Sequence, residues 1–85
     1  MSCYFEIETS PDTLEQVTRI LNDNETVTQI YRVTGCSKLH VHAVAASQAE
    51  MEQLVREVID PLPGVLRCSC NMILSRIKDI KGLRL

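Results

Sequence analysis

The sequence contains no tryptophan, and only one phenylalanine and two tyrosines are found among its 85 residues. Enzyme cavities are commonly lined by aromatic side chains, so this composition argues against an enzyme with such a cavity. A glycine-rich phosphate loop, a dinucleotide-binding fingerprint and an HExxH metalloprotease motif are also missing from the sequence. These absences exclude the common nucleotide-dependent enzymes and the helix-borne zinc proteases.

An excess of basic residues is lacking too. Nine Lys and Arg residues stand against 11 Asp and Glu residues, which gives a formal net charge of −2. Nucleic-acid-binding proteins usually carry a clustered basic surface, so we expect no direct contact with DNA. No apolar run is long enough for a signal peptide or a membrane span, which predicts a cytoplasmic protein with no membrane association. Its four cysteines are then expected to be free thiols.

What the sequence does contain is an internal repeat. SPDTLEQVTRIL, from Ser10, aligns without a gap on SQAEMEQLVREVI, from Ser47. Apolar residues recur at helical spacing in both segments, which predicts two amphipathic helices. Each segment opens with a serine that can cap a helix; Ser47 and Glu50 form a capping-box pattern, and Pro11 suits the first helical position.

Segments with a period of two flank both helices. Residues 3–8 and 39–45 precede them, and VTQIYRV and VLRCSCNMIL follow them, the latter after the helix-ending DPLPG. The order βαββαβ predicts an α+β, ferredoxin-like fold with an antiparallel sheet and two helices on one face. Residues 1–85 are expected to form one domain. The remaining tail, SRIKDIKGLRL, is expected to add an edge strand or to reach a partner.

The histidines of one strand and the cysteines of another are expected on opposite faces of the sheet. His40 and His42 alternate with apolar residues and should point away from the helices. Cys68 and Cys70 share the phase of Met72 and should lie on the core side, protected from thiol reagents. Opposite faces and non-adjacent strands exclude a combined zinc site, although a second subunit could complete a site on the histidine pair.

We therefore expect no metal and no cofactor. Cys36, which is close to a histidine in the sequence, could act as a nucleophile, but no acidic orienting residue or oxyanion motif stands near it. The residues alone thus predict no catalytic site.

Two motifs resemble those of a known family. IYRVTG at 30–35 and LPGVLRCSCNMILSRIKD at 62–79, at this spacing, resemble the effector-binding domain of the Lrp/AsnC (feast/famine) transcriptional regulators. The resemblance covers nearly the whole chain, because the repeat and the element order agree with it. It implies a module that senses small molecules and oligomerises: two sheets pack into a dimer of the α+β barrel type, dimers form rings, and amino acids bind between dimers.

The helix-turn-helix that these regulators usually carry is not in this sequence, which begins with methionine directly at the first strand. The resemblance is therefore to the stand-alone form of the domain. The initial methionine favours a complete chain, and a truncated one stays open as the alternative. Such a protein would modulate transcription through full-length Lrp/AsnC regulators as partners and would not bind DNA itself.

The resemblance also implies an effector pocket. Its lining would come from a loop and from the last strand, at Thr34, Gly35, Cys36, Ser37, Lys38, Cys68, Cys70 and Asn71. Core packing is the alternative role for the two cysteines of the strand. The loop offers the cation of Lys38 and hydrogen-bond donors, and no acidic residue lies between Arg32 and Ala49, so we expect the loop to bind the carboxylate of an amino acid.

Two other functions stay open at this point. Dimeric ferredoxin-like folds also host small enzymes, because a fold alone does not decide function. The chain could also be a purely structural assembly domain without a ligand.

The predicted open sheet face generates a first testable prediction. A lone domain of this size gains stability when it buries more apolar surface, so light scattering in the micromolar range should give at least a dimer. Duplex DNA at physiological salt should not bind. A monomer at every concentration would contradict the first expectation, and retention of DNA would contradict the second.

Overall fold

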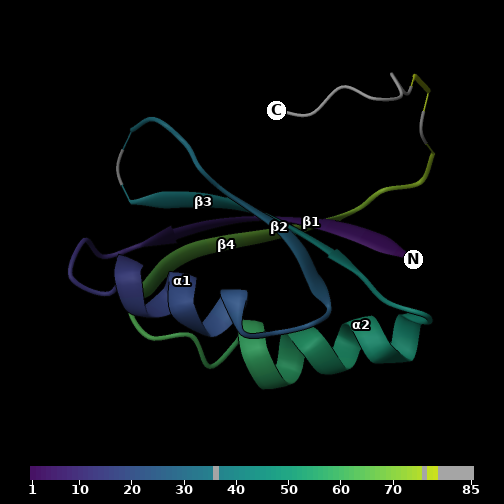
Figure 1. Ribbon diagram of the computed structural model, residues 1–85, viewed down its shortest axis with the longest axis horizontal. Coiled ribbons are helices and arrows are strands. Elements are labelled where there is room, and N and C mark those ends of the chain that lie inside the picture. Colours follow the sequence, from purple (N-terminus) through teal and green to yellow (C-terminus); the bar gives the residue numbers. More distant parts are fainter. Residues whose placement is uncertain (36, 76, 79–85) are drawn as a thin grey trace.

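The computed structural model describes residues 1–35, 37–75 and 77–78 (Figure 1). A four-stranded antiparallel sheet has the strand order β2-β3-β1-β4, and both helices lie on one side of it (Figure 1). This arrangement confirms the predicted ferredoxin-like βαββαβ fold. In chain order the elements are β1 (Ser2–Thr9), α1 (Leu14–Asn22), β2 (Val27–Arg32), β3 (Lys38–Val44), α2 (Gln48–Leu54), the π-helical turn η1 (Val55–Ile59) and β4 (Val65–Met72).

The core lies between the helices and the two central strands, β1 and β3. Every second residue of β1 is buried, and its neighbours are half-buried on the opposite face. β3 follows the same alternation over most of its length. A fully buried aliphatic or aromatic side chain stabilises the fold by about 1.5–3 kcal/mol. The largest such side chains are Phe5, Ile7, Leu21, Leu39, Val17 and Val41.

The two helices begin differently. Ser47 caps α2 as predicted, because its hydroxyl accepts a hydrogen bond from the Glu50 amide at 3.2 Å, and the Glu50 carboxylate accepts one from the Ala46 amide at 3.3 Å. α1 does not begin at Pro11 as predicted, but at Leu14. Residues 10–13 instead form a turn closed by the amide of Thr13 and the carbonyl of Ser10, at 3.1 Å.

The chain between α2 and β4 follows the predicted DPLPG turn. The Asp60 amide donates to the Val55 carbonyl at 2.8 Å, which closes η1 and ends the helical segment. Leu62 is buried, and Gly64 has a φ of 68°. The Gly64 carbonyl accepts a hydrogen bond from the Ser10 amide at 2.8 Å. The turn therefore holds the start of β4 against the end of β1.

The two cysteines of β4 lie on the predicted face but are not protected. Cys68 pairs with Ile7 and Cys70 with Phe5, so both side chains share the face that the helices cover. Both cysteines are nevertheless exposed, which overturns the predicted protection. The reason is that β4 is an edge strand of the sheet, and none of its residues is buried.

Two further features of the fold concern the ends of elements. β4 ends at Met72, two residues before the end of the predicted strand segment, and most of the tail whose role we predicted, residues 76 and 79–85, lies outside the described residues. In the described ranges, the helices are too short and too polar to span a membrane.

Gly64 generates a stability prediction. The backbone at Gly64 has the left-handed conformation, which strains any residue with a side chain. An added Cβ would also collide with the hydroxyls of Thr13 and Ser10. We expect Gly64→Ala to lower the free energy of unfolding by about 1–3 kcal/mol, measured by urea denaturation. Gly35→Ala is the matched control, because Gly35 also has a positive φ but no atom lies within 4 Å of an added Cβ. An equal loss in both variants would show that the collision contributes nothing.

Candidate functional site

The loop that the sequence indicated joins β2 to β3. The Val33 amide donates to the Lys38 carbonyl at 3.2 Å, which closes the loop, and the Thr9 amide donates to the Ser37 carbonyl at 2.8 Å, which fixes the loop to the end of β1. Thr34 and Gly35 are exposed, and Gly35 has a φ of 109°, a conformation that L side chains rarely adopt. Cys36 lies outside the described residues.

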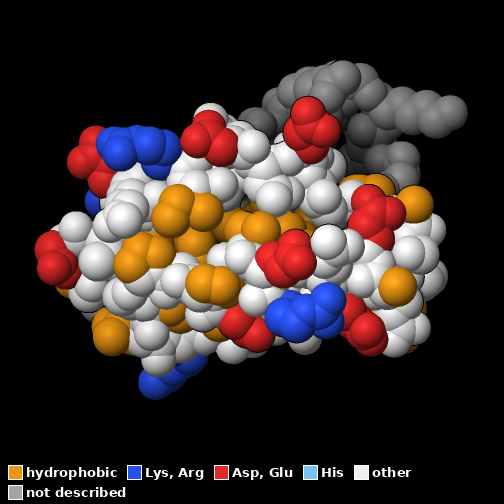
Figure 2. Space-filling model, turned by 90° about the horizontal axis from the view of Figure 1, so that it is seen from below, with side chains coloured by type: hydrophobic (Ala, Val, Ile, Leu, Met, Phe, Trp, Pro, Cys, Tyr) orange, Lys and Arg blue, Asp and Glu red, His pale blue; other side chains and the backbone are white. Residues whose placement is uncertain are grey.

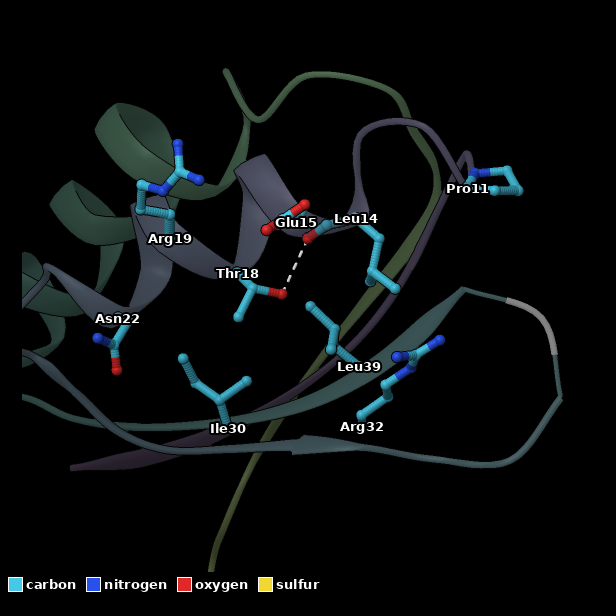
Figure 3. A pocket seen from close by; sticks show the side chains of 9 residues that line it. All are labelled: Pro11, Leu14, Glu15, Thr18, Arg19, Asn22, Ile30, Arg32 and Leu39. Atoms are coloured by element: carbon cyan, nitrogen blue, oxygen red, sulfur yellow. Dashed lines mark hydrogen bonds between the residues drawn. The ribbon is translucent and has the colours of Figure 1, made fainter.

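A cleft of about 790 Å³ lies beside the base of this loop, between α1 and the strands β2 and β3 (Figure 3). Arg32 and Leu39, which line it, are the residues on either side of the loop segment. Apolar side chains from all three elements contribute to its walls, and polar and charged side chains surround them. The lining residues are Pro11, Leu14, Glu15, Thr18, Arg19, Asn22, Ile30, Arg32 and Leu39.

The charged side chains of the cleft differ in direction. Figure 3 shows Arg32 rising from β2 beside Leu39, whereas the guanidinium of Arg19 points away from the strands. Among the residues that the structure describes, neither arginine forms an ion pair within 4.0 Å. The Thr18 hydroxyl donates to the Leu14 carbonyl at 2.8 Å, so its proton is engaged. Arg32 and Glu15 thus give the cleft a cation and a carboxylate near an apolar wall.

Lys38, which we expected to bind a carboxylate, already has a carboxylate partner within the chain. Its Nζ atom lies 3.0 Å from Oε1 of Glu6. Lys38 precedes Leu39 in β3, so the two side chains lie on opposite faces of the sheet, and Leu39 is the one that lines the cleft. The Lys38 ammonium holds the pKa of Glu6 below its usual value, and the Glu6 carboxylate raises the pKa of Lys38.

The open face of the sheet carries a cluster of aromatic and titratable side chains. The Tyr4 hydroxyl is 2.8 Å from Nδ1 of His40, and Nε2 of His40 is 3.7 Å from Glu6. His42 meets the rings of Tyr4 and Tyr31 edge-on. The histidines therefore point away from the helices, as predicted, and an acidic partner for His40 comes from β1 rather than from its own stretch of sequence.

Within a single chain, the predicted site residues of the loop lie apart from those of the last strand. Cys68, Cys70 and Asn71 belong to β4, which β1 separates from β3 and its loop. Asn71 also faces the side opposite to the two cysteines, because it pairs with Tyr4. In the described part of the chain, no three His, Cys, Asp or Glu side chains are grouped so that they could hold a metal ion.

Sequence reasoning missed the charged residues of the cleft. Arg32 stands inside the quoted YRVTG motif, next to the loop that was chosen, and Glu15 belongs to the repeat. The signal that could have indicated Arg32 is its position: an arginine at the end of a strand, close to a glycine-containing loop, can bind a ligand. That the two residues line one cleft depends on how α1 packs on β2 and β3.

The Glu6 and Lys38 pair generates a prediction on pH. A carboxyl group whose pKa is lowered by folding stabilises the fold at pH values above its pKa in the unfolded chain. A lysine whose pKa is raised by folding stabilises the fold at pH values below its pKa in the unfolded chain. The pair therefore contributes between the ordinary pKa values of Glu and Lys, about 4.3 and 10.4. In an NMR titration, Lys38→Met should raise the Glu6 pKa toward its ordinary value, and Lys38→Arg should keep it low. No change in Lys38→Met would show that another group lowers this pKa.

Comparison with known proteins identifies a family and related folds. A family model, the Lrp/AsnC ligand binding domain, matches residues 2–83. A comparison with curated proteins finds no similar sequence.

Several solved structures share the fold. AsnC of E. coli superposes with a TM-score of 0.82 at 15% identity and covers 93% of this chain, which covers 54% of that protein. A transcriptional regulator from Neisseria meningitidis in complex with L-Met superposes with a TM-score of 0.83 at 15% identity. The match covers 98% of this chain and 55% of that protein. A hypothetical protein from Pyrococcus horikoshii superposes with a TM-score of 0.75 at 23% identity, and the match covers 88% of this chain and 93% of that protein.

The chain thus spans about half the length of the first two proteins and nearly all of the third. At these identities the structural likeness establishes the fold, and the family model carries the assignment. Since that model matches almost every residue, the chain belongs to the Lrp/AsnC ligand-binding domain family.

Proposed function

We propose that residues 1–85 form a single effector-binding and oligomerisation domain that senses an amino acid in the cytoplasm. In this proposal it modulates transcription through full-length Lrp/AsnC regulators, does not bind DNA itself and catalyses no reaction. The observation that carries the proposal is the cleft at the base of the β2 and β3 loop, in a chain that matches the family over residues 2–83. A relative from Neisseria meningitidis has been solved in complex with L-Met.

The chemistry of the cleft fits a zwitterion with an apolar side chain. A guanidinium binds a carboxylate through two parallel hydrogen bonds, which is the role we assign to Arg32. Glu15 would accept hydrogen bonds from the α-ammonium group. Ile30 and Leu39 would contact the side chain of the amino acid. The volume, about 790 Å³, lies within the range of about 300–1,000 Å³ that is usual for small-molecule sites.

A second subunit is part of the proposal. The loop residues Thr34 and Gly35 are exposed, and the β4 residues that the family resemblance indicated lie two strands away from β3. We therefore assign the predicted residues to a shared site, in which the loop of one subunit meets another subunit. The open sheet face around Tyr4, His40 and His42 provides aromatic surface for the dimer contact.

The surface charge supports the absence of DNA contact in this proposal. The net charge is −2. On the helix-covered face, acidic and basic side chains of the described residues are interspersed, without a continuous basic patch (Figure 2). Protein surfaces that bind nucleic acid concentrate lysine and arginine on one face.

The test is a thermal-shift screen of the twenty amino acids combined with light scattering. At a ligand concentration 100 times Kd, binding stabilises the protein by about 2.7 kcal/mol, so at least one amino acid should raise Tm and change the oligomer size. Arg32→Ala should abolish this response, and Arg32→Lys should weaken it, because a lysine cannot make the paired hydrogen bonds.

The control variant is Arg56→Ala, since Arg56 is an exposed arginine of η1, outside the cleft and away from the open sheet face. Without ligand, both alanine variants should unfold within about 0.5 kcal/mol of the parent, as is usual for surface substitutions. The pocket assignment is wrong if Arg32→Ala responds like the parent. A parent that responds to none of the amino acids would leave structural assembly as the function.

A further inference from the structure

A second cleft, of about 460 Å³, is rich in sulfur. It lies between the adjacent strands β1 and β4 and the helical segment of α2 and η1. The chain has three methionines and four cysteines. All three methionines and two of the cysteines line this one cleft: Met1, Cys3, Met51, Cys70 and Met72. The first cleft, beside α1, contains neither residue type.

The pairing of the strands explains why these sulfur atoms converge. Cys3 of β1 lies directly opposite Met72 of β4, and Cys70 lies opposite Phe5 and is therefore diagonal to Cys3. Directly opposed side chains have Cβ atoms about 4.5–5.5 Å apart, and diagonal ones lie within about 7–8 Å. Met51 reaches the same cleft from α2. Three elements thus bring two thiols and two thioethers to one place.

Core packing explains only part of this arrangement. Cys3 and Met51 are 3% and 4% exposed and belong to the hydrophobic core. Met72 is 48% exposed, and Cys70 is exposed as well. Cysteine and methionine that serve packing alone are usually buried. Here one buried thiol and one buried thioether stand beside exposed counterparts, so the sulfur atoms are both held in place and accessible.

The donor set selects the kind of ligand. Thiolates and thioethers are soft ligands and favour Cu(I), whereas structural zinc sites use four thiolate, imidazole or carboxylate ligands. Within the described residues no such group of three or more occurs, and the cleft has no histidine. We propose that this cleft binds one Cu(I) ion through the thiolates of Cys3 and Cys70 and the thioethers of Met51 and Met72.

Binding should depend on pH. Thiolates rather than thiols bind the metal, so copper displaces the thiol protons and its affinity rises with pH. The other charged groups that line the cleft are the N-terminal ammonium of Met1, Glu52, Arg56 and Asp60. The two cations offset the two carboxylates, so two thiolates and one Cu(I) leave the site with one net negative charge.

The experiment is a titration of the full chain with Cu(I) under anaerobic conditions, in competition with a chromophoric Cu(I) chelator. We expect one tight equivalent per chain, with ultraviolet absorption from thiolate-to-copper charge transfer. The double variant Met51→Leu, Met72→Leu conserves volume and should lower the affinity at least about tenfold, which corresponds to about 1.4 kcal/mol. Cys70→Ser should remove the tight equivalent.

Cys68→Ser is the matched control, because Cys68 lies two residues along β4 on the same face but does not line the cleft. It should bind copper like the parent, and circular dichroism should show that all variants are folded. A methionine double variant that binds as tightly as the parent overturns the proposal, as does an equal loss in Cys68→Ser. Zn(II) that competes with Cu(I) at equal concentration would overturn the selectivity.

Discussion

The alternation of side chains along β1 is the constraint on which the rest of the structure depends. β1 pairs with β3 on one side and with β4 on the other, so it sets the register of both. Because Phe5 and Ile7 face the helices, their cross-strand partners must face them too. The residues that alternate with them, Tyr4 and Glu6, then make their polar contacts with His40 and Lys38 on the open face. A shift by one residue would exchange the two faces.

The fold was largely predictable because its signals are local. Each of these signals, namely the period-two segments, the repeat and the DPLPG turn, predicts its structure from a few neighbouring residues. The cap at Ser47 was predicted correctly. The wrong helix start has a tertiary cause. Pro11 suits a first helical turn, but the Ser10 amide is bound by Gly64, which is distant in sequence, and a turn forms instead.

Burial and site geometry were less predictable. The face of Cys68 and Cys70 follows from alternation, whereas their exposure follows from the edge position of β4, which no local pattern states. The loop was located by its motif. The cleft beside it needs Glu15 from α1 and Arg32 from β2, and only the packing of these elements brings the two residues together. The ion pair of Lys38 was not predictable from the loop sequence, because its partner, Glu6, belongs to another strand.

The end of β1 fixes two segments that are distant in sequence. The Thr9 amide holds the loop between β2 and β3 through Ser37, and the next amide, of Ser10, holds the start of β4 through Gly64. The register of β1 with β4 shifts at this same point, between Glu8 and Thr9. Two adjacent peptide groups of β1 and its end thus fasten one segment on each side of the strand. A change of backbone conformation at Thr9 or Ser10 would therefore disturb both attachments at once.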